Sequence, residues 1–75
     1  MIEEMIKVLE MKKLDLLRLE EDAQCYMEYI QSLKTPYELA VFGKDKLDKL
    51  IETQTLISST SENIRMLEYL INKNN

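Results

Sequence analysis

The side chains best suited to chemistry in this sequence are one cysteine and a short run of carboxylates. Cys25 is the only cysteine among the 75 residues, and there is no histidine. A cysteine nucleophile needs a neighbouring base or a positive environment, whereas the nearby charged residues Glu21, Asp22 and Glu28 are acidic. The absence of histidine excludes the commonest general base, histidine-containing metal sites and the usual catalytic triads. We therefore predict that Cys25 has a packing or bystander role and that the protein is not an enzyme.

The acidic run Glu20, Glu21 and Asp22 is a weak candidate for a cation site. Consecutive residues of a helix point in different directions, so these carboxylates do not converge on one ion. Paired carboxylates for acid–base chemistry would need a pocket, which two packed helices do not supply. The run is expected to be a solvated acidic surface, and no metal, cofactor or small-molecule substrate is expected.

The composition predicts one all-α domain spanning residues 1–75. Hydrophobic residues make up 45% and charged residues 32%, with a single glycine and a single proline, and β proteins need many more turn residues. The net charge of −4 and the lack of a basic stripe argue against nucleic-acid binding. The acidic start and the lack of a long apolar run argue against a signal peptide and a membrane span. A lone cysteine favours a reducing compartment, so a cytoplasmic location is predicted.

A heptad pattern runs through residues 2–33 and predicts a long helix of the coiled-coil type. Two positions of each heptad form an inner seam in which Lys12 is the exception to apolar character. The seam consists of Ile2, Met5, Leu9, Lys12, Leu16, Leu19, Ala23, Tyr26, Ile30 and Leu33.

The stretch from Thr35 to Glu38 has the form of a capping box, with Thr35 as N-cap, Pro36 at the first helical position and Glu38 three residues after the cap. Because a proline pushes the preceding residue out of the α region, the first helix should end near Lys34. The sequence therefore predicts an antiparallel helical hairpin with helices 2–34 and 36–73 and a turn at 34–35. Pairing the arms across that turn places Gly43 opposite Tyr26 and Lys12 near 57–58.

The second arm is less regular and leaves two alternatives open. Gly43 either caps a short helix over 36–42 or lies within one continuous helix, which we favour because a missing side chain suits a position opposite a large ring. The hydroxyl-rich segment 53–61 contains a second capping-box match, which would kink or split the arm near Ser58 and Ser59. The expected inner face comprises Leu39 or Ala40, Gly43, Leu47, Leu50, Ile57, Ile64, Leu67 and Ile71.

The first helix carries more apolar residues than one seam can bury. Val8, Met11, Leu14 and Leu17 lie outside the seam, and covering them would remove on the order of 300–400 Å² of apolar surface from water, about 8–10 kcal/mol gross. We therefore expect a protein partner, as a homo-oligomer or a heterodimer. Tyr29 and Tyr37, near the turn, are expected to remain partly exposed, and aromatic residues are common at interface hot spots.

The segment from Pro36 to Glu38, followed by the apolar residues Leu47, Leu50, Leu56 and Ile57, resembles the small helical-hairpin co-chaperones of bacterial type III secretion needle subunits. The resemblance covers residues 15–60 and is one of pattern, without a diagnostic motif. It implies a protein that pairs with a second, repeat-type chaperone to keep an export substrate from aggregating.

The function that the sequence favours is a non-catalytic adaptor or scaffold that presents an apolar helix face to a partner or to itself. The alternatives are the secretion co-chaperone and a small inhibitor or regulator that binds and blocks an enzyme or transcription factor. Residues predicted to bind the partner are Val8, Met11, Leu14, Leu17, Tyr29 and Tyr37.

Overall fold

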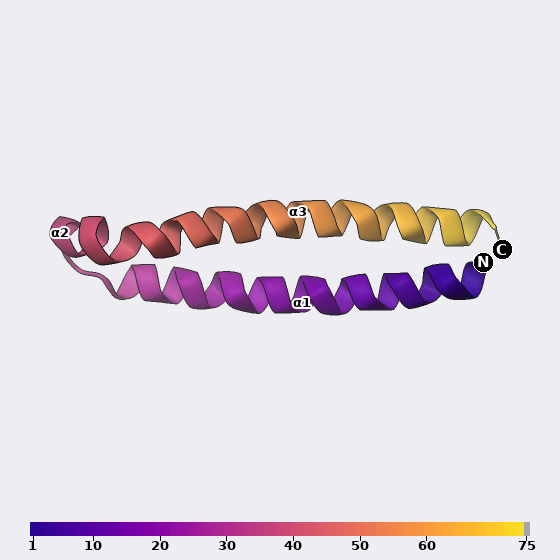
Figure 1. Ribbon diagram of the computed structural model, residues 1–75, viewed down its shortest axis with the longest axis horizontal. Coiled ribbons are helices and arrows are strands. Elements are labelled where there is room, and N and C mark those ends of the chain that lie inside the picture. The colour runs from indigo at the N-terminus through magenta and orange to yellow at the C-terminus, as the bar shows by residue number, and fades with distance from the viewer. Residues whose placement is uncertain (75) are drawn as a thin grey trace.

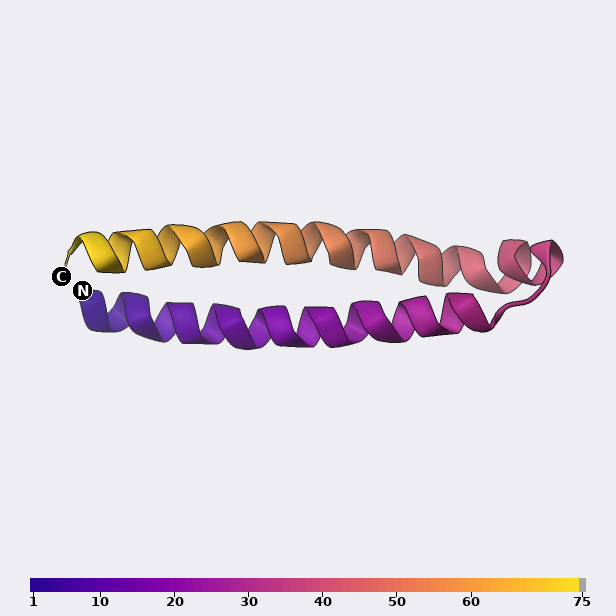
Figure 2. The ribbon, with the colours of Figure 1, turned by 180° about the vertical axis from the view of Figure 1, so that it is seen from behind.

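The chain folds into an antiparallel helical hairpin, as the computed structural model, which describes residues 1–74, shows (Figure 1). Helix α1 spans Ile2–Ser32, and after a three-residue link the chain continues through α2 (Pro36–Glu38), the π-helical turn η1 (Leu39–Gly43) and α3 (Lys44–Lys73). The molecule measures 56 × 14 × 13 Å. The first turn of α1 and the last turn of α3 lie together at one end, and α2 lies at the other, here called the tip (Figures 1 and 2).

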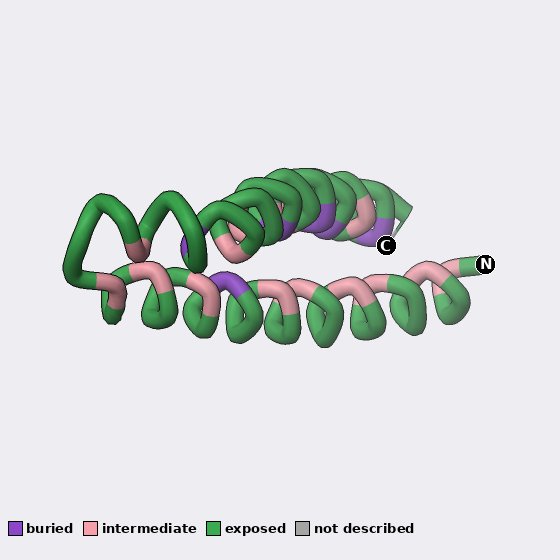
Figure 3. The backbone as a smooth tube through the Cα atoms, turned by 60° about the vertical axis from the view of Figure 1, so that its left-hand side comes forward, coloured by how far each residue is buried: buried purple, intermediate pink, exposed green. Residues whose placement is uncertain are grey.

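The inner seam of α1 is confirmed in full. All ten seam positions from Ile2 to Leu33 are buried or half-buried, and all other residues between Glu3 and Ser32 are exposed. In Figure 3 the buried and half-buried stretches of α1 and α3 lie on the sides that face each other. The apolar repeat of 3.5 residues therefore determined which side of the first helix meets the second.

The seam of α3 was predicted only in part. Leu50, Ile57, Ile64, Leu67 and Ile71 are buried or half-buried as expected. The observed seam continues this spacing of alternating three and four residues through positions that carry polar side chains. It consists of Gly43, Lys46, Leu50, Thr53, Ile57, Thr60, Ile64, Leu67 and Ile71.

Leu39, Ala40 and Leu47 are exposed, so their expected place on the inner face is wrong. The seam position next to Leu47 is taken by Lys46, whose ammonium group lies 5.8 Å from the ring centroids of both Tyr26 and Tyr29. A lysine can lie along such a seam because its apolar stem is buried while its charge reaches the faces of aromatic rings.

Thr53 and Thr60 are buried, although neither was expected on the inner face of the second arm. The Thr53 hydroxyl donates a hydrogen bond of 2.7 Å to the carbonyl of Lys49, one turn earlier in the same helix. This intrahelical bond satisfies the hydroxyl without a partner from α1, so the threonine methyl group can face the seam.

The capping box is present at the tip. The Thr35 hydroxyl accepts a 3.1 Å hydrogen bond from the Glu38 N–H, and the Glu38 carboxylate accepts one of 3.2 Å from the Lys34 N–H. Helix α1 ends at Ser32, two residues before the expected end, because both Leu33 and Thr35 are extended, with ψ angles of 128° and 153°.

The helix that starts at Pro36 continues without a break to Lys73, as the favoured alternative predicted. Gly43 has right-handed helical angles (φ −90°, ψ −22°) and ends no helix. The π-helical turn η1 precedes it, which the sequence did not indicate. The alternative of a split near Ser58 and Ser59 is wrong, because both residues lie inside the single helix α3.

The pairing of the two arms differs from the prediction by about one heptad (~7 residues). Gly43 lies against Leu33 instead of Tyr26: a Cβ added to Gly43 would lie 3.0 Å from the Leu33 Cδ1 atom. Three heptads further along both helices, the same register places Lys12 opposite Ile64 instead of 57–58. The link and the π-helical turn together lengthen the reversal, and a shift of one whole heptad keeps the same sides of both helices inward.

Candidate interaction surface

All six residues predicted to bind a partner are exposed, from 40% at Tyr29 to 72% at Tyr37. Five of them lie on α1, whereas Tyr37 lies in α2 at the tip. The side chains predicted to be available to a partner are thus accessible in the hairpin, and their arrangement around the helix decides which of them can act together.

The four apolar residues of the first helix do not share one side. They recur every third residue, and each step of three turns backwards by about 60° around a helix of 3.6 residues per turn. Val8 and Met11 therefore lie on one flank of the seam, Leu14 on the back of α1, and Leu17 on the opposite flank. The predicted face of α1 is a band that winds around the helix.

A larger apolar surface combines the first of these flanks with residues of α3 that the sequence analysis missed. Asp15 and Arg18 of α1 lie beside Leu56 of α3 on one flank of the hairpin. Residues one or two heptads from these positions share that flank. Met66 also lies on it, because the step of ten residues from Leu56 to Met66 makes nearly three whole turns of the helix. We call the exposed apolar residues of this flank the Leu56 face, which consists of Val8, Met11, Tyr29, Leu56, Met66 and Leu70.

The opposite flank has fewer large apolar residues. A shallow depression at its centre is lined by three polar and three apolar residues: Glu20, Gln24, Gln54, Ala23, Met27 and Ile57. Near the open end of this flank, Lys13 of α1 and Glu68 of α3 form an ion pair of 3.7 Å across the hairpin. We call its exposed apolar residues the Ile51 face, which consists of Ile6, Leu17, Met27, Leu47 and Ile51.

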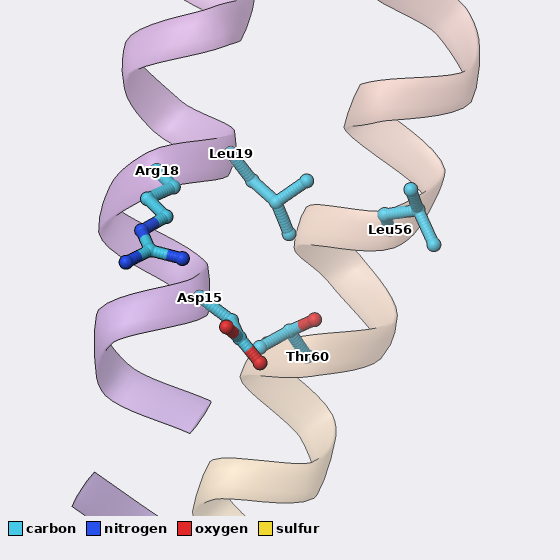
Figure 4. A pocket seen from close by; sticks show the side chains of 5 residues that line it. All are labelled: Asp15, Arg18, Leu19, Leu56 and Thr60. Carbon is cyan, nitrogen blue, oxygen red and sulfur yellow. The ribbon is translucent and has the colours of Figure 1, made fainter. Parts of the chain in front are cut away.

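The middle of the Leu56 face is slightly hollowed (Figure 4). Leu19 points from α1 towards α3, Asp15 and Thr60 lie next to each other between the helices, and Arg18 and Leu56 complete the lining. It is an open groove between two helices, so it suits the side chains of a packed protein better than an enclosed ligand.

A third apolar group lies at the tip. Tyr37, Leu39, Val41 and Phe42 follow one another through α2 and η1, and each is at least 45% exposed. A π-helical turn is wider than an α-helical one and often occurs at functional positions. Tyr26 does not belong to this group, because it lies half-buried in the seam, with the Lys46 ammonium group 5.8 Å from its ring centroid.

The hairpin has far more surface than a compact protein of its size. Its accessible surface is 5967 Å², whereas a compact monomer of 8.9 kDa has about 4,800 Å². Within residues 1–74 the buried apolar side chains are Ala23, Ile64 and Ile71, against eighteen large hydrophobic residues that are exposed. Two long helices form only one seam, so most of the apolar surface has no neighbour.

The thiol and the carboxylates of residues 1–74 form no metal-binding group. Cys25 is an exposed free thiol on α1. In the part of the chain that the structure describes, no three Cys, Asp or Glu side chains come together as a metal-binding group. Across the same residues, no helix combines the length and the apolar character that crossing a membrane requires.

The comparisons with known proteins found no matching family model, no matching curated protein and no matching solved structure.

Proposed function

We propose that this protein is a non-catalytic interaction module that presents apolar helix surface to a protein partner. The observation that carries the proposal is the excess of surface: about 1,200 Å² beyond that of a compact monomer, together with eighteen exposed large hydrophobic side chains within residues 1–74. A standard protein–protein interface covers about 800 Å² on each partner, so one partner would account for most of that excess.

The chemistry of the surface supports docking by helix packing. Exposed apolar side chains lie three or four residues apart at several places on both helices, such as Val8 and Met11 on α1 and Met66 and Leu70 on α3. Each such pair shares one side of its helix, where another helix can pack. Charged residues between them would set the alignment of the partner more than the affinity. A secretion co-chaperone and an inhibitor of an enzyme or transcription factor are narrower forms of this proposal and stay predictions.

The test is the mass of the native particle. The tagged chain is purified without denaturant and measured by size exclusion with light scattering, and we expect a particle heavier than one chain. Met11→Lys combined with Leu17→Lys removes one apolar residue from each flank and should reduce the bound mass while leaving the helix content unchanged. Gln31→Lys combined with Thr55→Lys adds the same charge at exposed polar positions and is the control.

A helical single chain that binds neither itself nor another protein in any preparation would contradict the proposal. The same conclusion would follow if the control variant lost as much bound mass as the apolar variant, because charge rather than apolar contact would then be responsible.

A further inference from the structure

We propose that the Leu56 face is the binding site for a second copy of this chain, so that two hairpins form a symmetric four-helix bundle with both tips at the same end. The inference rests on the proposed function and names the partner. Its first support is area: the surface of this chain beyond that of a compact monomer exceeds the ~800 Å² that a standard interface covers on each partner.

The second support is the difference between the two flanks. The Leu56 face carries Val8, Met11, Met66 and Leu70 close together at the open end, all exposed. The Ile51 face has Glu20, Gln24 and Gln54 at its centre, and at its open end the Lys13–Glu68 ion pair is already satisfied within one chain. Each flank carries one carboxylate at its centre, Glu20 on the Ile51 face and Asp15 on the Leu56 face, so the two flanks differ mainly at the open end.

The third support is that the Leu56 face complements itself in one orientation. In a two-fold contact the same patch is used by both subunits. A two-fold axis parallel to the long axis of the hairpin stacks α1 of one copy on α3 of the other. Residues that are paired across one hairpin then also lie beside each other between the two copies. In the register set by Leu33 and Gly43, Met11 and Met66 are at one level, so Met11 of each copy meets Met66 of the other and the apolar open ends cover each other.

Charge agrees with this orientation at the open end of the face, whereas nearer the tip the same stacking sets Asp22 of one copy at the level of Glu52 of the other. Glu4 lies one heptad before Met11 and Lys73 one heptad after Met66, so both lie on the same flank at the same level of the hairpin. Stacking α1 on α3 of the second copy sets Glu4 beside the opposite charge of Lys73. A two-fold axis perpendicular to the long axis of the hairpin would instead place the apolar open end of one copy against the part of the other copy's Leu56 face nearer the tip, which carries Asp22 and Glu52.

The first experiment compares two matched variants of purified full-length protein by light scattering over a concentration series. Leu56 and Ile51 are both on α3 and are 53% and 58% exposed. Leu56→Lys should raise the dissociation constant of the dimer by roughly tenfold or more, because it places a charge inside the interface. Ile51→Lys should leave the dimer unchanged. Circular dichroism of each variant reports whether the helices persist.

The second experiment tests the orientation by cross-linking. Met11→Cys and Met66→Cys are made in separate chains that also carry Cys25→Ser, and the two proteins are mixed under mild oxidation. With the tips together, the new cysteines of different chains meet, and a covalent dimer of one chain of each kind forms. A mixture of Leu17→Cys and Ser58→Cys chains, which also carry Cys25→Ser and have their new cysteines at one level on the Ile51 flank, should give none.

The outcomes separate this inference from the proposed function. A wild-type protein that is monomeric when pure, or a dimer disrupted by Ile51→Lys and not by Leu56→Lys, overturns the inference. A cross-link from the control mixture alone does the same. If the pure chain is monomeric but is recovered in a heavier complex with another protein, the inference fails and the proposed function stands. If neither form of association occurs, both fail.

Discussion

Leu33 lies against Gly43 so closely that a Cβ atom on the glycine would be 3.0 Å from the leucine Cδ1 and 2.8 Å from the Cδ1 of Leu39. The glycine thus lets the extended end of α1 approach the start of α3. The sequence predicted Tyr26 opposite Gly43, one heptad earlier on α1 than Leu33. The contact between Leu33 and Gly43 therefore defines the register of the whole hairpin.

Substitutions at Gly43 should separate the effect of helix propensity from that of the room available for a side chain beside Leu33 and Leu39. Gly43→Ala should change the free energy of unfolding by less than about 1 kcal/mol, since the gain in helix propensity of ~1 kcal/mol is offset by the displacement of two leucine methyl groups. Gly43→Leu should cost about 1–3 kcal/mol because the larger side chain must displace Leu33. Urea denaturation at fixed protein concentration measures both, and a Gly43→Leu protein as stable as the wild type would refute the contact.

The cap at the tip gives a second prediction. Thr35→Ala removes the hydroxyl that accepts the Glu38 N–H and should destabilise the protein by about 1 kcal/mol. Thr55→Ala is the matched control: its hydroxyl bonds to the carbonyl of Ile51 within α3 and is exposed, so its removal should change stability by less than about 0.5 kcal/mol. Equal losses of stability from Thr35→Ala and Thr55→Ala, in thermal or urea unfolding, would mean that the Thr35 hydroxyl bond does not stabilise the start of the helix.

The seam itself can be tested with two isoleucines on the same helix. Ile64 is 8% exposed and Ile51 is 58% exposed. Ile64→Ala should lower the free energy of unfolding by about 2–4 kcal/mol through lost burial and an unfilled space. Ile51→Ala should cost less than about 1 kcal/mol, because little apolar area is lost. A larger loss of unfolding free energy from Ile51→Ala than from Ile64→Ala would contradict the prediction, because it would place the seam on the other side of α3.

The ion pair between Lys13 and Glu68 predicts a measurable coupling across the hairpin. A double-mutant cycle with Lys13→Ala and Glu68→Ala should give a coupling of about 0.2–1 kcal/mol, since both side chains are half exposed. The coupling should shrink in high salt because exposed charges are screened. A cycle between Lys13→Ala and Glu62→Ala should show none, because Glu62 pairs with Arg65. If that second cycle gave the larger coupling, the register would be wrong.

The fold could be predicted from the sequence where the pattern is local. Every seam residue from Ile2 to Leu33 was identified, since the apolar side chains themselves repeat every 3.5 residues. The alignment of the arms could not be predicted, because sliding one helix by a heptad returns the same sides to the seam. Only the link after Ser32 and the π-helical turn at Leu39–Gly43 distinguish the two registers, and neither has a signature in residue types.

For the candidate surface, the exposure of single residues could be predicted, but their grouping across the two helices could not. The exposure of Val8, Met11 and Tyr29 followed from their positions outside the α1 seam. Their grouping with Leu56 and Met66 did not follow, because a flank of a hairpin is shared by two helices whose phases must both be known. On α3 that phase is obscured by Lys46, Thr53 and Thr60 in the seam, so the exposed apolar residues could not be told from the buried ones.

The two ends of the hairpin are unlike, with the chain ends at one and the tip at the other, 56 Å away along the longest dimension (Figures 1 and 2). In the dimer proposed here, both tips point the same way and stand side by side. A target that binds one tip weakly would meet the second at an effective concentration in the millimolar range. Dimerisation would therefore combine two apolar tips, each of which binds weakly, into one bivalent binding site. Its avidity would depend on dimerisation and would need no added contact at the tip itself.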